Sequence, residues 1–335
     1  MPLVIPLFIP HRGCPHQCLF CNQNSITGAG QEDTLGGEDV ARTLQTWLAR
    51  SPGHNEVQAA FFGGSFTCLP QEEQEELLLA VQPFLDSGEV DWIRLSTRPD
   101  CISEEICEFL LAHRVGIVEL GVQSFDDEVL RAAKRGHAAA DCRRSVRLLK
   151  VAKLQVGVQL MPGLPGETTR SFLAGIRETI SLAPAFVRLY PAVVLRHSQL
   201  GRDWQSGGYQ PLSLNRAVAL VARAKVLFDK AGIPVVRMGL QPSLELEREV
   251  LAGPYHPAFG ECVLSRLWFK EIRQQLAHLE AGRHLTLHVS QRDQSAIIGT
   301  KKINIRRLES LGYADRFTLQ ADLHRKRGSR EYVVS

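Results

Sequence analysis

The chain has 335 residues, of which 44% are hydrophobic and 22% are charged, and these values are typical of an ordinary globular protein with an ample core. The sequence gives no sign of a membrane span, because no apolar run approaches the ~20 residues that a spanning helix requires. The formal net charge is only +3, but residues 283–335 carry 11 Lys and Arg against 5 Asp and Glu. This basic end is compatible with a polyanionic partner, and an ordinary scatter of surface charge would explain it equally well.

Short buried strands alternate with helices through the first two thirds of the chain. The expected strands cover residues 3–9, 56–62, 91–96, 115–121, 154–160 and 186–190. The expected helices cover residues 40–49, 70–85, 140–152, 167–182 and 213–231, with further helices beginning after Ser103 and Ser124. Six strands alternating with helices indicate βαβ units and a parallel sheet. We therefore expect an α/β fold, a partial (β/α)6 TIM-like barrel, over residues 1–231.

The alternation of strand and helix changes beyond residue 231. One more strand is expected at residues 233–240, followed by a loop-rich stretch, a helix at 263–279 and a strand at 285–289. We expect residues 232–335 to form a small C-terminal α+β domain that is basic at its end.

Three cysteines follow the first expected strand in a C-x3-C-x2-C spacing, and they are Cys14, Cys18 and Cys21. Soft thiolates select zinc or iron–sulfur clusters. Structural zinc prefers four ligands, often in C-x2-C pairs, and no second pair exists, although His11 or His16 could complete a zinc site. A cubane cluster normally takes four thiolates. Three clustered cysteines without a nearby fourth favour a [4Fe–4S] cluster with one iron open to another ligand.

The remaining five cysteines are scattered, and they are Cys68, Cys101, Cys107, Cys142 and Cys262. The N-terminus is apolar but lacks a leading basic residue, so a secretory signal peptide is not expected. We therefore expect these cysteines to be reduced, and the protein to be cytoplasmic.

Each expected strand is followed by a short polar or glycine-rich segment. In (β/α) barrels the segments that follow the strands meet at one face of the barrel, which holds the active site. With the cysteine loop, these segments resemble the radical S-adenosylmethionine (SAM) superfamily. The resemblance covers residues 4–240 and is greatest to the catalytic subunit of Elongator and to oxygen-independent coproporphyrinogen oxidase. The motifs that carry it are Gly63-Gly64-Ser65-Phe66, Gly121-Val122-Gln123-Ser124-Phe125-Asp126-Asp127, Arg135-Gly136-His137 and Gly163-Leu164-Pro165-Gly166-Glu167-Thr168.

The resemblance implies a mechanism and its cofactors. Cys14, Cys18 and Cys21 would hold three irons of a [4Fe–4S] cluster, and the amino and carboxylate groups of SAM would chelate the fourth. One electron, from a donor such as flavodoxin or ferredoxin, would split SAM into methionine and a 5′-deoxyadenosyl radical. That radical would abstract hydrogen from the substrate.

The resemblance also assigns contacts to SAM. Gly63 and Gly64 would let the backbone approach the methionine amino group, although they could form only a tight turn. Gln123 and Arg135 match polar contacts to the cofactor, and a guanidinium suits a carboxylate. Phe20 would pack near the adenine.

Two of the assigned cofactor contacts depart from the family pattern. Ser96 stands where relatives often have an acidic residue, so its expected bond is from a hydroxyl to the ribose. Gln159 replaces a familiar Asp. For catalysis on the substrate the candidates are Tyr190, at a late strand end, and Cys68, as a thiol hydrogen donor or simply a packing residue.

The substrate is open at this point. Elongator's subunit acts on tRNA but carries an acetyltransferase domain, and we expect none here because the chain ends at residue 335. The first hypothesis is an enzyme that modifies an RNA base, and specifically a base in tRNA. The alternatives are a radical SAM enzyme acting on a small metabolite or porphyrin-like substrate, and a non-enzymatic metal-binding module.

Overall fold

The computed structural model describes residues 2–9, 12–22 and 35–335. The chain divides into two compact units, the first comprising residues 1–217 and 224–255 and the second residues 218–223 and 256–335. Over the described residues, none of the helices combines the length and the apolar character needed to cross a membrane.

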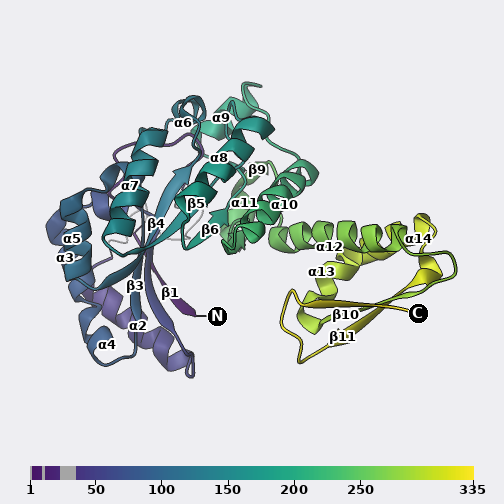
Figure 1. Cartoon of the computed structure of the whole chain (residues 1–335). Coiled ribbons are helices and arrows are strands. Elements are labelled where there is room, and N and C mark those ends of the chain that lie inside the picture. The colour runs from purple at the N-terminus through teal and green to yellow at the C-terminus, as the bar shows by residue number, and fades with distance from the viewer. Residues whose placement is uncertain (1, 10–11, 23–34) are drawn as a thin grey trace. The chain divides into compact units, whose positions relative to one another are not determined.

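A parallel sheet of seven strands forms the frame of the first unit, in the order β1-β2-β3-β4-β5-β6-β8. The strands are β1 (Leu3–Phe8), β2 (Val57–Phe62), β3 (Trp92–Thr97), β4 (Val115–Gln123), β5 (Gln155–Leu160), β6 (Phe186–Leu189) and β8 (Val235–Met238). The expected partial barrel is confirmed, with seven strands instead of six (Figure 1). The extra strand is β8, which we assigned to the second domain and which pairs with β6 instead.

The helices of the first unit lie between successive strands and include α3, α5, α7 and α8 along one face of the sheet (Figure 1). Their bounds are α2 (Gly37–Arg50), α3 (Gln71–Leu79), α4 (Gln82–Asp86), α5 (Glu104–Ala112), α6 (Asp127–Ala132), α7 (Ala139–Val151), α8 (Thr169–Leu182), α9 (Gln199–Gln205), α10 (Leu214–Lys230) and α11 (Leu244–Glu249). Residues 218–223 in the middle of α10 are grouped with the second unit. Two short antiparallel strands, β7 (Val194–Leu195) and β9 (Val250–Ala252), complete it.

Two helix predictions need correction. The single helix expected over residues 70–85 is two helices, because Pro83, which lacks an N–H donor, stands in the first turn of α4. The cap of α6 is Asp126, whose side chain accepts hydrogen bonds from the N–H groups of Glu128 and Val129. Ser124 instead accepts a bond from the Asp126 N–H, within the preceding turn.

The strands separate apolar from polar side chains by alternation. In β3, Ile93 and Leu95 are fully buried, whereas Arg94 and Ser96 point to the opposite face. The polar side chains on that face are available to line a functional site.

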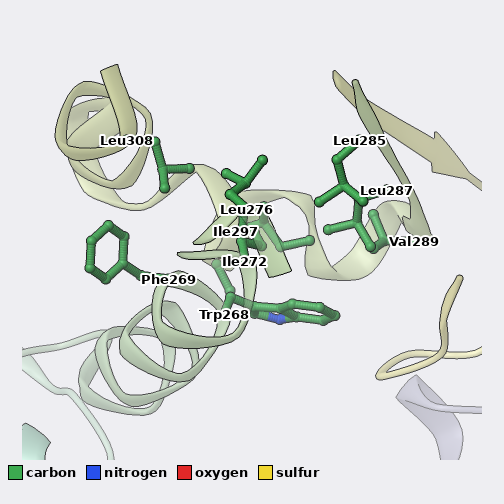
Figure 2. Packing of buried hydrophobic residues seen from close by; sticks show 10 residues of the cluster. Trp268, Phe269, Ile272, Leu276, Leu285, Leu287, Val289, Ile297 and Leu308 are labelled. Carbon is green, nitrogen blue, oxygen red and sulfur yellow. The ribbon is translucent and has the colours of Figure 1, made fainter. Parts of the chain in front are cut away.

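The second unit is an α+β structure built on a three-stranded sheet in the order β11-β10-β12, in which β10 is parallel to β11 and antiparallel to β12. Its elements are α12 (Phe259–Ala277), β10 (Leu285–Ser290), α13 (Gln294–Ile298), α14 (Ile303–Ser310), β11 (Phe317–Asp322) and β12 (Arg330–Val334). Figure 2 shows its core, where Trp268 and Ile272 of α12 meet Leu285 and Leu287 of β10 and Leu308 of α14.

Candidate functional site

The cysteine loop lies against the loop that follows β2, backbone to backbone. The N–H of Ser65 donates to the carbonyl of Arg12 at 2.9 Å. A Cβ added to Gly64 would lie 2.4 Å from the carbonyl oxygen of Ile9, and one added to Gly13 would lie 2.3 Å from that of Ser65. Gly13 (φ +72) and Gly63 (φ +98) also have left-handed backbones that glycine favours. The structure thus gives Gly64 a role that we did not expect, which is close contact with the cysteine loop.

Arg135 joins the cysteine loop to the end of β4. Its Nη1 donates to Cys18 Sγ at 3.0 Å, and its Nη2 donates to the carbonyl of Gly121 at 2.6 Å. The side chain is buried, and its Nε has no hydrogen-bond partner among the described residues. The guanidinium carbon lies 5.9 Å from the centre of the Phe20 ring. Arg135 therefore places a buried positive charge between Cys18 and the strand end.

A second arginine, Arg98, is hydrogen-bonded to the backbone of Arg135. Arg98 follows β3 and donates to the carbonyl of Arg135, and it forms an ion pair with Asp100 at 3.0 Å. Asp100 lies 3.6 Å from His137 Nδ1. Burial, and after it the charge of Arg135, lowers the pKa of His137 to about 4, so this imidazole is neutral near pH 7. Arg98 and Asp100 were missed from the sequence, although both lie in the segment that follows the third expected strand.

Gln123 and Gln159 meet beside Arg135. Gln159 Nε2 donates to Gln123 Oε1 at 3.4 Å, and Gln123 has a left-handed backbone (φ 68) where the pairing of β4 and β5 is irregular. A Cβ on Gly121 would lie 3.1 Å from the side-chain nitrogen Nε2 of Gln123 and 3.4 Å from Arg135 Nη2. The glycine therefore leaves room for both side chains at one strand end.

Phe20 and Ser96 differ in their surroundings. The Phe20 ring packs on buried apolar residues that include Met161, Leu164 and Ala192, and it is only partly buried. Ser96 is half-buried on the inner face of the sheet, beside its register partner Glu119 on β4.

Cys68 forms a disulfide with Cys101, with the two Cα atoms 5.5 Å apart. The prediction that both are reduced is wrong, and so is the proposal of Cys68 as a thiol hydrogen donor, because a disulfide has no S–H group. The physical reason is the parallel pairing of β2 and β3, which brings together the 3-10 turns that follow them, Phe66–Cys68 and Pro99–Cys101. Cys107, Cys142 and Cys262 are free, as expected.

An ion network crosses the inner face of the sheet. Glu119 accepts from Arg94 Nε at 2.5 Å, and its other oxygen lies 2.8 Å from Arg188 Nε. Arg188 also donates to the hydroxyl of Tyr190 at 3.0 Å, which places this candidate residue beside the network. The sequence signal for the network was a charge in the middle of an apolar strand, as at Arg94 and Glu119.

On the sheet face that carries this network, arginines outnumber carboxylates among the described residues. Arg237 is the register partner of Arg188, so three arginines share this face with Glu119. A further carboxylate, Glu56, reaches Arg94 only through the amide of Gln58.

The loop after β5 holds a buried carboxyl group, that of Glu167. It accepts from the N–H of Gly163 at 2.7 Å, and its other oxygen has no partner among the described residues. Burial raises the pKa of Glu167 to about 8. The sequence motif contained this residue, but nothing in it indicated a protonated side chain.

The described residues contain no ready-made group of three His, Cys, Asp or Glu side chains that could hold a metal ion. Cys18 is buried, and Cys14 and Cys21 are half-buried. Burial and the neighbouring Cys18 raise the pKa of Cys14, whereas Arg98 and Arg135 lower it. Soft thiol donors beside two guanidinium groups, each with an N–H that lacks a partner in the described part of the chain, fit an anionic iron–sulfur cluster and a carboxylate ligand.

Known protein families match the part of the chain that contains the cysteine loop and the barrel. The family pattern described as Radical SAM superfamily matches residues 8–177, and that of the Radical_SAM C-terminal domain matches residues 184–268. Among curated proteins, the tRNA uridine(34) acetyltransferase of Methanocaldococcus jannaschii is 28% identical over 265 residues, covering 68% of this chain and 49% of that protein. Elongator complex protein 3 of Saccharomyces cerevisiae is 27% identical over 198 residues, covering 52% of this chain and 35% of that protein.

Solved structures share the fold. The archaeal Elp3 of Methanocaldococcus infernus gives a TM-score of 0.62 at 20% identity, covering 82% of this chain and 63% of that one. Coproporphyrinogen III oxidase of Escherichia coli gives 0.51 at 17% identity, covering 69% and 53%. The chain spans about half the length of the first curated relatives it matches, at 49% and 48%. Because the superfamily pattern covers just over half of this chain and includes all three clustered cysteines, the chain belongs to the radical SAM superfamily.

Proposed function

We propose that this enzyme modifies a base in tRNA by radical SAM chemistry, with Cys14, Cys18 and Cys21 holding three irons of a [4Fe–4S] cluster. The observation that carries the cofactor assignment is the bridge from Cys18 Sγ through the Arg135 guanidinium to the Gly121 carbonyl. This bridge ties the cysteine loop to the strand ends of the barrel, so a cofactor held by the loop would lie against Gln123 and Gln159.

The chain's own residues bind and orient. Arg135 and Arg98 supply buried positive charge for the cluster and the SAM carboxylate, and Gly63 and Gly64 keep the backbone close. Gln123, Gln159 and the hydroxyl of Ser96 would hold polar atoms of SAM, with Phe20 against the adenine. When bound and reduced, the cluster and SAM together supply the 5′-deoxyadenosyl radical that abstracts hydrogen from the substrate. Tyr190, held by Arg188, is our candidate on the substrate side.

The choice of tRNA rests on the named relatives and on charge. The M. jannaschii relative acts on tRNA uridine 34 by its name, and its match covers 68% of this chain. Residues 283–335 carry a net charge of +6, which suits a phosphate backbone. We further propose a one-electron donor such as flavodoxin or ferredoxin, and the cytoplasm as the place where the enzyme meets tRNA.

A second candidate is a small substrate that carries a carboxylate or phosphate. The surplus of arginines on the inner face of the barrel, Arg94, Arg188 and Arg237 against Glu119, favours it, because an anion would balance the surplus charge.

The cofactor assignment is tested by anaerobic reconstitution of the full chain with iron and sulfide. We expect absorbance at ~400 nm and formation of 5′-deoxyadenosine from SAM after reduction. Cys18→Ala should lose both, and Cys107→Ala, which removes a buried thiol from α5, should keep both. Unchanged iron content in Cys18→Ala would overturn the ligand assignment.

The substrate assignment is tested on tRNA isolated from cells that lack the protein. Incubation with the reduced enzyme and SAM should produce a nucleoside of new mass by liquid chromatography and mass spectrometry, and binding to bulk tRNA should weaken steeply with salt. Formation of 5′-deoxyadenosine without any change in tRNA nucleosides, combined with binding that does not respond to salt, would reject tRNA and favour the small substrate.

A further inference from the structure

The second unit contains a helix–loop–helix between two parallel strands. The chain runs from β10 through α13, a four-residue loop and α14 into β11, and β10 and β11 pair in parallel from Leu285 opposite Phe317 to Ser290 opposite Asp322. The core in Figure 2 fixes this arrangement, because Ile297 of α13 and Leu308 of α14 are buried with α12 and β10. The family patterns end at residue 268, before all of these elements.

The loop itself is Gly299-Thr300-Lys301-Lys302, and its shape is firmly determined. Gly299 has a φ of +74, and a Cβ there would lie 2.9 Å from Ile303 Cγ2 and 3.0 Å from Ser265 Oγ. Buried Asn304 donates to Ser265 Oγ at 2.8 Å and to the Ile297 carbonyl at 3.0 Å, so it ties the loop to α12 and α13. The loop is therefore held in place by the core of the second unit.

Two exposed lysines stand on this anchored loop. Lys301 (φ 52) and Lys302 (φ 59) both have left-handed backbones, a conformation that costs a lysine roughly 1–2 kcal/mol. Arg306 is exposed in the first turn of α14. Over residues 256–335 there are 14 Lys and Arg against 8 Asp and Glu, so the whole segment is basic.

A groove of about 300 Å³ runs beside the loop. It is lined by Ile298 of α13, Lys302 of the loop, Ile305 and Glu309 of α14, and Tyr313 and Phe317 near β11. Apolar and aromatic side chains form most of this lining, Lys302 adds a positive charge, and Glu309 is its acidic member. Such a groove offers faces on which bases stack, next to cations that contact phosphates.

We infer that this helix–loop–helix binds single-stranded RNA, with the phosphate backbone on Lys301 and Lys302 and the bases in the groove. KH modules clamp the backbone of about four nucleotides with a Gly-x-x-Gly loop. The loop here also begins with glycine, and it lies between two helices beside a groove and carries two lysines. Here the fourth position of the loop holds Lys302 with the positive φ that glycine favours. The site stands on the second unit alone, and only the choice of RNA over DNA rests on the proposed function.

The test uses the full chain and a fluorescein-labelled, ten-nucleotide single-stranded RNA of mixed sequence, with DNA of the same sequence and an RNA duplex as separate arms. We expect the single-stranded RNA to bind most tightly. Lys301→Asp/Lys302→Asp should weaken its binding by at least about tenfold and flatten its salt dependence, because each lysine that contacts a phosphate contributes about one unit of slope. Aspartate tolerates the left-handed backbone, so the fold should survive, which circular dichroism checks.

The matched control is Lys153→Asp/Arg147→Asp. Lys153 is an exposed lysine with the same left-handed backbone (φ 61) in the first unit, and Arg147 is exposed on α7 of that unit. This control changes the net charge equally and should leave RNA affinity within about twofold. Lys302→Gly, which removes a charge without requiring a left-handed side chain, should weaken binding by a smaller factor than the double variant.

Three results would overturn the inference: unchanged affinity in Lys301→Asp/Lys302→Asp, an equal loss in the control, or tighter binding of DNA or duplex RNA. The 5′-deoxyadenosine formed without substrate should be the same in all variants, since it reports only on the barrel. If tRNA is modified while short RNA does not bind, the inference fails and the proposed function stands. If short RNA binds and tRNA is not modified, the inference stands and the proposed function fails.

Discussion

At the scale of single residues, Arg135 carries the clearest chemistry in the barrel. One guanidinium donates in two directions at once, to a cysteine sulfur and to a backbone carbonyl, while it remains buried. A lysine has the same charge but presents it at one point, so it cannot span the two acceptors.

We therefore expect Arg135→Lys to retain iron but to form 5′-deoxyadenosine at least about tenfold more slowly. Iron content and product formation are measured on the same reconstituted sample. Arg144→Lys, an exposed arginine on α7, is the control and should behave like the parent. If Arg135→Lys is as active as the parent, the bridge does not position the cofactor.

Glu167 gives a prediction for pH. Burial raises its pKa from 4.5 to about 8, so between these values the folded state keeps a proton that the unfolded state has lost. The stability of the parent should therefore fall as the pH rises through this window. Glu167→Gln cannot ionise, and its side-chain carbonyl can still accept the N–H of Gly163.

Measured by urea unfolding, Glu167→Gln should gain stability relative to the parent on going from pH 5 to pH 9. The gain should be a few kcal/mol, since one pKa unit corresponds to ~1.4 kcal/mol. An equal difference between the two proteins at both pH values would show that Glu167 does not titrate in this range.

At the scale of elements, the loops after β1 and β2 behave as one structure. Gly13 and Gly64 each occupy a position where a side chain would meet backbone atoms of the other loop. Backbone atoms cannot move aside as the end of a side chain can, so this contact tolerates no Cβ.

Gly64→Ala isolates this effect, because a Cβ there would lie 2.4 Å and 2.5 Å from two carbonyl oxygens. We expect it to displace the cysteine loop and to reduce iron incorporation severalfold, with a loss of roughly 1–3 kcal/mol in unfolding free energy. Gly208→Ala is the control, since its Cβ would meet only ordinary contacts at 3.4 Å and beyond. Full iron loading in Gly64→Ala would show that the two loops are not coupled.

At the scale of the whole molecule, the barrel of the first unit is tied together by charge as well as by its strands. Glu119 of β4 joins Arg94 of β3 and Arg188 of β6, and Gln58 of β2 extends the network. The Arg94 guanidinium also lies 4.6 Å from the centre of the Phe186 ring. Removal of the single central carboxylate would leave two arginines without a counter-charge.

Glu119→Gln should therefore lower the free energy of unfolding by about 3–5 kcal/mol, the usual effect of breaking a buried ion pair. Urea unfolding measures it, and Glu108→Gln, an exposed glutamate on α5, should change stability by less than about 0.5 kcal/mol. A small effect of Glu119→Gln would mean that solvent or another anion balances the arginines.

The sequence by itself determined the features that depend on neighbours along the chain. The spacing of Cys14, Cys18 and Cys21, the glycines at the end of β2 and the alternation of strands with helices are local patterns, and they were sufficient to predict the family and the barrel. Strand and helix periodicity are local because hydrogen bonding and side-chain direction repeat over a few residues.

Only the tertiary structure decided which distant residues meet. The Cys68–Cys101 disulfide joins residues 33 apart, Arg135 reaches a sulfur 117 residues away, and β8 belongs to the barrel although it follows a long excursion of the chain. Such contacts depend on strand order and register, which no local pattern encodes. Lys301 and Lys302 in the sequence were two charges in a basic tail, and the parallel pairing of β10 with β11 placed them on an anchored loop beside a groove.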